Sequence, residues 1–93
     1  MPAPAPGVSV TLPGALASLF PGCPRAVPLE ASTVGEAVTA LDQLWPGFRD
    51  RVCDGSPALR RHIRIFVRGE IAGLQTQLVP GDEVVVITAI SGG

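Results

Sequence analysis

The chain has 93 residues, 46% of them hydrophobic, which suits one small domain with its own core and is too apolar for a disordered segment. Its formal net charge of −1 excludes the strongly positive surface of proteins that bind nucleic acids or anionic membranes. Two cysteines, Cys23 and Cys53, are too few for a disulfide scaffold or a four-cysteine metal site, so we expect no bound metal. We expect two thiols, although one disulfide between them remains open at this point.

The N-terminal residues 1–7, MPAPAPG, have neither a basic start nor an apolar run. They therefore predict a flexible leader and not a secretory signal. The most apolar stretch, residues 84–90, is too short to cross a bilayer. We expect a cytoplasmic protein that does not insert into membranes.

Two strands are predicted before the first long helix. Residues 8–12 alternate apolar and polar side chains, the period of a half-buried strand. Residues 13–25 contain three prolines and two glycines, so we expect a loop or a short turn there. Residues 25–31 predict a second strand at an edge of the sheet, because Pro28 has no N–H to donate.

The strongest local pattern predicts a helix over residues 33–45. Thr33 is a good N-cap, and Glu36 follows at the spacing of a capping box. Pro46-Gly47 predicts the end of the helix. The apolar residues form one stripe at helical period: Val34, Ala37, Val38, Leu41, Leu44 and Trp45.

The second half of the chain predicts two further strands. We expect a loop over residues 46–61 and a strand over residues 62–67, followed by a turn at Gly69-Glu70. Residues 71–79 fit no single pattern and leave room for one helical turn. After a turn at Pro80–Asp82, residues 83–89 are apolar on both faces, which favours a strand inside the sheet.

This order of elements predicts a small α+β roll. A first hairpin, a helix across the sheet and a last strand beside the first one give a mixed sheet of four to five strands with one main helix. We assign one globular domain to residues 8–89 and a tail to residues 90–93.

The tail ends in Gly92-Gly93, which can be ordinary terminal fraying or a reactive end. It follows the most apolar strand without a linker, and glycine has no Cβ, so it can enter a narrow channel. The carboxyl of Gly93 is a poor electrophile until it is activated, which ATP can do by forming an acyl adenylate. A sulfur nucleophile can then displace AMP and leave a thiocarboxylate.

The ending DEVVVITAISGG, residues 82–93, together with the length and the order of elements, resembles the MoaD/ThiS family of ubiquitin-like sulfur carriers, which are β-grasp domains. Residues 62–70, HIRIFVRGE, resemble the third strand and following turn of that family, with Arg68 where Asn is common. Residues 81–84, GDEV, resemble the entry to its last strand. The resemblance covers most of the chain and implies a β-grasp fold.

The resemblance implies a carrier protein and not an enzyme, or the small subunit of a sulfur-transferring synthase. Gly93 would be adenylated by a ubiquitin-activating-type adenylyltransferase, which uses the ATP, so we expect no cofactor bound to this chain. The thiocarboxylate would then donate sulfur to a partner synthase in molybdopterin, cysteine or secondary-metabolite biosynthesis. Gly92 would give the clearance that lets the carboxyl group enter a partner.

One face of the strand at 62–67 predicts a docking surface. His62, Arg64, Phe66 and Arg68 point to the side opposite Ile63, Ile65 and Val67. We expect Phe66 to be the apolar anchor for the activating enzyme, with Arg64 and Arg68 as the rim. Ile90, past the last strand, is expected to contact the partner as well. The alternative is an ordinary solvated strand face.

Two other functions remain open. The chain could be a ubiquitin-like modifier whose Gly93 forms an isopeptide bond with a target lysine, or a β-grasp interaction module with inert glycines. The lone His62 has no partner at catalytic spacing, so we expect no catalytic role for it. All seven basic residues are arginines. The absence of lysine either prevents self-acylation or reflects a bias in composition.

Overall fold

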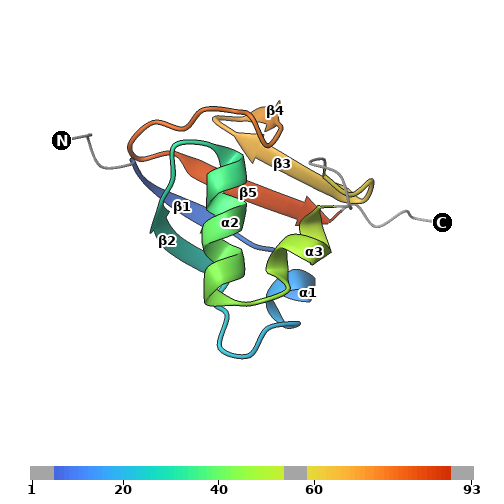
Figure 1. Cartoon of the computed structure of the whole chain (residues 1–93). Helices are drawn as coiled ribbons and strands as arrows, with labels where there is room; N and C mark the ends of the chain where they lie inside the picture. Colours follow the sequence, from blue (N-terminus) through green and yellow to red (C-terminus); the bar gives the residue numbers. More distant parts are fainter. Residues whose placement is uncertain (1–5, 54–58, 89–93) are drawn as a thin grey trace.

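The computed structural model describes residues 6–53 and 59–88, which include every helix and strand named below. The expected leader lies largely outside this part, and so does the tail with Ile90, Gly92 and Gly93. In chain order the elements are β1 (Gly7–Thr11), α1 (Gly14–Ala17), β2 (Ala26–Glu30), α2 (Val34–Leu44), α3 (Phe48–Val52), β3 (Ile63–Val67), β4 (Glu70–Ala72) and β5 (Glu83–Thr88) (Figure 1).

The five strands form one mixed sheet in the order β2-β1-β5-β3-β4. β1 is antiparallel to β2 and parallel to β5, and β3 is antiparallel to both β5 and β4. The last strand therefore lies beside the first, in the interior of the sheet, as the sequence predicts. Pro28 pairs with Ser9 from the edge strand β2, where its missing N–H is tolerated.

The helix α2 begins at the predicted cap. The Thr33 Oγ1 accepts a hydrogen bond from the Glu36 N–H at 3.1 Å. The Glu36 carboxylate accepts one in return from the Ser32 N–H at 2.9 Å, one residue earlier than in a standard capping box. Local side chains thus accept hydrogen bonds from the backbone N–H groups of both Ser32 and Glu36, where the helix begins.

A long-range contact joins the start of α2 to the segment that leads into β5. The Gly35 N–H donates to the Leu74 carbonyl at 2.8 Å, and Thr33 forms an isolated bridge with Gln77. A Cβ at Gly35 would lie 3.1 Å from that carbonyl oxygen, which is closer than ordinary packing. A side chain there would push the Leu74 carbonyl away by a few tenths of an ångström, so glycine favours this approach, which helps to hold α2 across the sheet.

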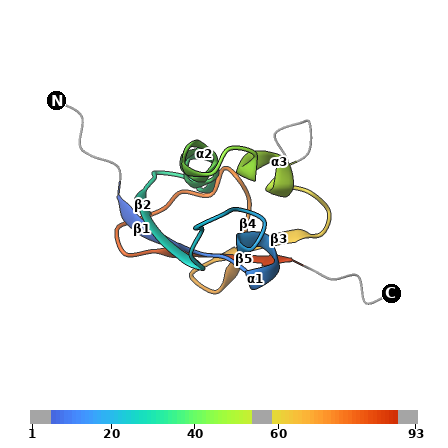
Figure 2. The ribbon, with the colours of Figure 1, turned by 90° about the horizontal axis from the view of Figure 1, so that it is seen from below.

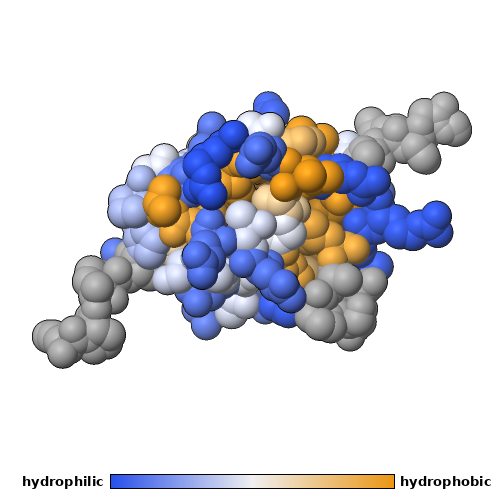
Figure 3. All heavy atoms as spheres, turned by 90° about the horizontal axis from the view of Figure 1, so that it is seen from above, coloured by the Kyte–Doolittle hydropathy of each residue, from blue (hydrophilic) through white to orange (hydrophobic). Residues whose placement is uncertain are grey.

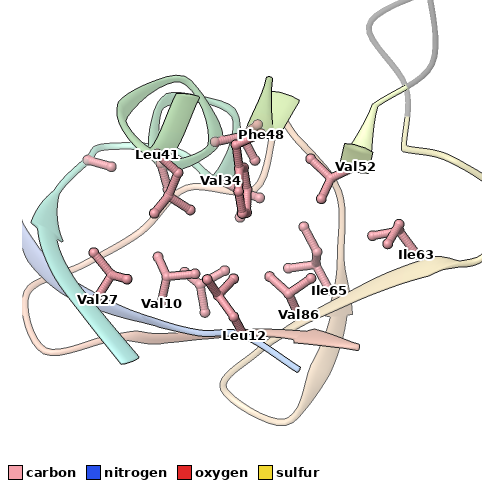
Figure 4. Packing of buried hydrophobic residues seen from close by; sticks show 14 of the residues in the cluster. Val10, Leu12, Val27, Val34, Leu41, Phe48, Val52, Ile63, Ile65 and Val86 are labelled. Atoms are coloured by element: carbon pink, nitrogen blue, oxygen red, sulfur yellow. The ribbon is translucent and has the colours of Figure 1, made fainter. Parts of the chain in front are cut away.

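The hydrophobic core lies on one side of the sheet, under α2 and α3 (Figure 2). Side chains from the two helices, Leu41, Val34, Phe48 and Val52 among them, point toward the inner face of the strands (Figure 4). The facing residues of the sheet are Val10, Leu12, Val27, Ile63, Ile65 and Val86. Leu44, which the helical stripe placed in the core, is 57% exposed because it lies at the last turn of α2.

The loop expected over residues 46–61 contains the short helix α3. Gly47 enters it with a φ of 96°, and the Asp42 carboxylate accepts hydrogen bonds from the Gly47 and Arg49 N–H groups at 3.2 and 3.0 Å. Phe48 and Val52 are fully buried, and the Phe48 ring lies 5.6 Å from that of Phe20. The spacing of Phe48 and Val52, four residues apart, fits one helical turn but is too short a pattern to predict this helix.

A tight hairpin joins β3 to β4, with its turn at Arg68-Gly69, one residue before the predicted turn at Gly69-Glu70, so Glu70 already belongs to β4. Arg68 and Gly69 have φ values of 54° and 78°, and a two-residue type I′ turn needs positive φ at both positions. The third-strand pattern is confirmed: Ile63, Ile65 and Val67 are buried, and Arg64 is exposed. The described residues contain no helix long and apolar enough to cross a membrane. The two cysteines, both described, are not joined by a disulfide.

We expect Phe48→Ala to lower the free energy of unfolding by about 3–5 kcal/mol, because it leaves a cavity beneath α3 that the fixed ends of the helix cannot close. Leu44→Ala is the matched control and should change it by less than about 0.5 kcal/mol, because Leu44 is mostly exposed. Urea denaturation measures both values. Equal losses would contradict the placement of Phe48 in the core.

Candidate functional site

The candidate site begins where β5 ends. β5 is hydrogen-bonded on both sides, to β1 and to β3, and its last residue, Thr88, pairs with Ile63. Gly93 follows Thr88 by five residues in the sequence. Even fully extended, five residues span at most about 17 Å. The sheet therefore fixes Thr88, the point from which residues 89–93 continue, and the chain length limits how far Gly93 can lie from it.

The sheet face opposite α2 and α3 carries an apolar row. In the strand register Phe66 pairs with Ile71 on one side and Val85 on the other, so the three side chains lie in line across β4, β3 and β5. Ile87 follows Val85 on the same face. Ile71 is 67% exposed and Ile87 42% exposed, whereas Phe66 and Val85 are half-buried. We call these four residues the open-face row.

The two arginines predicted as the rim lie at opposite ends of β3. Arg64 is exposed near the end of β5, and its Nη1 donates to the Arg61 carbonyl at 2.6 Å. Arg68 lies in the β3–β4 turn and donates to the Asp82 carboxylate in an ion pair. The structure thus places Phe66 and Arg64 on one face of β3, opposite Val85 and Ile87 of β5, and ties Arg68 to the start of β5. Their roles in partner binding stay predictions, as does that of Ile90.

Asp82 is the buried acidic residue of the described chain, with 7% of its surface exposed. Its carboxylate accepts a hydrogen bond from the Val79 N–H at 2.9 Å, and its own carbonyl accepts one from Ser9 at 3.0 Å. The Val79 hydrogen bond and then the charge of Arg68 lower the pKa of Asp82 below its ordinary value, against the opposing effect of burial. Sequence reasoning noted this residue only as part of a turn.

The remaining candidates for chemistry do not form a catalytic group. Burial raises the pKa of the Cys23 thiol, which keeps it protonated and unreactive. Cys53 is buried in the core. His62 is exposed before β3. Across residues 6–53 and 59–88, no three His, Cys, Asp or Glu side chains gather closely enough to hold a metal ion.

Comparison with known proteins gives consistent matches over most of the chain. The model of the ThiS family matches residues 10–93. The sulfur carrier protein CysO of Mycobacterium tuberculosis is 30% identical over 92 residues, which cover 92% of this chain and 98% of that protein. Small archaeal modifier protein 1 of Haloferax volcanii is 36% identical over 62 residues, 67% of this chain and 71% of that protein.

A solved structure matches the fold closely. The crystal structure of the Amycolatopsis orientalis BexX/CysO complex contains a chain that superposes with a TM-score of 0.82 at 26% sequence identity. The match covers 92% of this chain and 99% of that chain. The mixed five-stranded sheet with its crossing helix is therefore the β-grasp architecture of the ubiquitin-like proteins.

We expect Asp82→Asn to destabilise the fold at neutral pH and to lose this effect in acid. The pKa of Asp82 is lowered in the folded protein, so its carboxylate stabilises the fold above the unfolded pKa of about 3.9. This stabilisation disappears as the pH falls through the folded value, because the wild-type group is then protonated in both states. Urea denaturation midpoints of wild type and variant are measured from neutral pH down to about pH 3. The difference between the two midpoints should shrink as the pH falls.

Glu70→Gln is the control for Asp82→Asn, because Glu70 is an exposed carboxylate at the same end of the sheet. It should unfold at the wild-type urea midpoint at neutral pH. A constant difference between wild type and Asp82→Asn at every pH would show that packing, and not the charge, is responsible.

Proposed function

The chain belongs to the ThiS family of ubiquitin-like β-grasp proteins, and from this premise we propose that it is a sulfur carrier activated at the carboxyl group of Gly93. The observation that carries the proposal is the family match, which runs through the last strand and on to Gly92-Gly93. The matched relatives are a sulfur carrier protein and a small modifier protein, and neither name is that of an enzyme. We therefore assign this chain a carrier role.

The proposed chemistry has two steps. An oxygen of the Gly93 carboxylate attacks the α-phosphorus of ATP, and pyrophosphate leaves, which gives an acyl adenylate. A hydrosulfide ion then attacks the carbonyl carbon, a C–S bond forms, and the C–O bond to AMP breaks. The products are AMP and a C-terminal thiocarboxylate, whose sulfur a second partner can accept. The ATP is bound by the activating enzyme and not by this chain.

The fold contributes position and access to these steps. β5 is fixed on both sides by the sheet, so the tail starts from a rigid base close to the docking surface. Holding a reactant in this way raises its effective concentration at the partner's site. Glycine at positions 92 and 93 leaves no Cβ to block a narrow channel.

Two partners follow from this role: an adenylyltransferase of the ubiquitin-activating type, and a synthase that accepts the sulfur. A CysO forms a complex with BexX in the matched crystal structure. We infer that this chain likewise docks a partner, through the open-face row with Phe66 at its centre. Apolar side chains with arginine nearby are the usual composition of the middle of such interfaces.

Protein modification is the second candidate, because small archaeal modifier protein 1 is 36% identical over its matched part. The acyl adenylate would then be attacked by a lysine amine of a target, which forms an isopeptide bond and releases AMP. The sequence contains no lysine. Each target lysine would therefore carry one copy of this protein. An attached copy has no lysine side chain to which a second copy could be joined.

We expect the chain, incubated with an activating enzyme of this type, ATP and sulfide, to gain the mass difference between sulfur and oxygen at Gly93. Intact-mass and C-terminal peptide spectrometry measure this change. Conjugates with cellular proteins in place of the thiocarboxylate would favour the modifier. No adduct with the enzyme and ATP would contradict both active roles and leave an inert interaction module.

Gly92→Ala should slow thiocarboxylate formation about tenfold or more, because a Cβ next to the reacting residue crowds the channel. Gly73→Ala is the matched control: a Cβ at Gly73 meets nothing within 4 Å, so this variant should react at the wild-type rate. The initial rate of AMP release measures both. Equal rates for the two variants would contradict the assigned role of Gly92.

Phe66→Glu should weaken activation by raising the KM for this chain about tenfold, while the domain stays folded, because Phe66 is only half-buried. Leu44→Glu introduces the same charge at an exposed position at the end of α2, away from the open-face row, and should leave the KM unchanged. Circular dichroism confirms the fold of both variants. An unchanged KM for Phe66→Glu would contradict docking through the open-face row.

A further inference from the structure

Four of the seven arginines gather around the end of β5. Arg60, Arg61 and Arg64 line an open groove along β3, and Arg51, from α3, lines a second hollow together with Thr88. The two hollows share His62 and Ile63, so they lie on either side of the start of β3. All four arginines are exposed, and we call them the arginine collar.

Backbone carbonyls, and not carboxylates, hold two of the four collar arginines in place. The Arg60 Nε donates to the Asp50 carbonyl at 2.7 Å, and the Arg64 Nη1 donates to the carbonyls of Arg61 and Ile63 at 2.6 and 3.1 Å. These bonds orient the guanidinium groups without neutralising their charge. Asp50 adds one carboxylate at this end of the described chain, but it forms no ion pair with the collar.

The acidic side chains gather at the other end of the sheet. Glu83 begins β5, Glu70 begins β4, and Glu30 ends β2 next to the start of β1. The one arginine at that end, Arg68, is neutralised by Asp82 in the ion pair recorded among the described residues. Among the described residues of these two ends, arginines are therefore concentrated at the end of β5 and carboxylates at its start, although the net charge of the chain is −1.

Apolar surface lies directly beside the collar. The groove that holds Arg60, Arg61 and Arg64 is also lined by Leu59 and Ile71. Ile71 belongs to the open-face row as well, so the collar and that row form one continuous surface. Figure 3, which views the molecule from the side of β3 and β4, shows hydrophobic atoms flanked by hydrophilic side chains on this side of the molecule.

The length of the tail determines what can lie against the collar. The carboxyl group of Gly93 is at most about 17 Å from Thr88, and Thr88 lines the same hollow as Arg51. A protein that takes this carboxyl group into a channel must therefore press the mouth of the channel against the end of the fold. Four arginines there form no ion pair with a described residue, and they favour a mouth lined with carboxylates, within the screening length of about 10 Å.

Resting on the proposed function, we propose that the arginine collar docks an acidic margin around the channel by which the activating enzyme receives the tail. The open-face row supplies the apolar contact, and the collar supplies attraction and orientation. The association rate should therefore depend on both the collar and the salt concentration, whereas the chemical step should not.

The double variant Arg51→Gln, Arg61→Gln tests the collar, because these two side chains donate no recorded hydrogen bond and can be replaced without disturbing the fold. Binding to the activating enzyme is measured without ATP, and adenylation is measured with it, from about 50 mM to 500 mM NaCl. We expect association to slow about tenfold at low salt, with little change in kcat, and the difference from wild type to vanish at high salt.

The matched control is Gln43→Glu, Gln75→Glu, which changes the net charge by the same amount. Both glutamines are exposed and lie away from the collar, on α2 and on the segment before β5. This variant should associate at close to the wild-type rate. An equal loss in both variants would overturn the collar and show an effect of net charge alone.

The remaining outcomes separate the two proposals. Salt-sensitive binding that depends on the collar but yields no adenylate would sustain the collar and overturn activation at Gly93. Adenylation that is insensitive to salt and to the collar variant would sustain activation at Gly93 and overturn the collar. Binding of ATP by this chain alone would assign the collar to the nucleotide and overturn an acidic protein margin, and no binding of wild type to the enzyme would overturn both.

Discussion

The parallel pairing of β1 with β5 is the constraint from which the rest of the structure follows. Ser9 pairs with Glu83, so the first and last strands of the domain lie side by side and point the same way. Parallel neighbours cannot be joined by a hairpin and need a crossover, here formed by the intervening helices and strands. The crossover places α2 and α3 on one face and leaves the other face of the sheet uncovered (Figure 2). It also fixes the direction in which β5 delivers the tail.

This division of the sheet explains why β5 is apolar on both faces. Val84 and Val86 are buried beneath the helices, whereas Val85 and Ile87 lie on the open face beside Phe66. A contiguous exposed apolar row is costly for a small protein in water and usually marks a surface that a partner covers. The Arg68–Asp82 pair serves the other end of the strand, where it holds the β3–β4 turn against the start of β5. One end of β5 is thus fixed for stability, and the other end remains accessible.

Sequence patterns were sufficient where the determining interactions are local. The Thr33–Glu36 cap and the alternation from Ile63 to Val67 could both be predicted directly, whereas the role of the di-glycine end stays a prediction. The helix α3 could not, because five residues are too few for a helical period and its cap comes from Asp42 on the preceding helix. β4 depends on a hairpin turn at a non-glycine residue with positive φ, which its sequence disfavours. The collar needed the tertiary fold, because Arg51 on α3 and the arginines before and within β3 line neighbouring hollows only in the folded chain.

The short tail limits which partners can bind a carrier of this kind at the same time. Every partner that reaches the carboxyl group of Gly93 must cover the same end of the fold, because the tail extends no more than about 17 Å beyond Thr88. In the proposed function, an activating enzyme and a sulfur acceptor would therefore compete for one surface, and the chain would have to leave the first before it could bind the second. Very tight binding would trap it at either stage. Exposed charges at the rim of an interface change the association rate more than the dissociation rate, since they act over a distance before contact. An apolar row of moderate size with a charged collar beside it meets that requirement better than a larger apolar interface would.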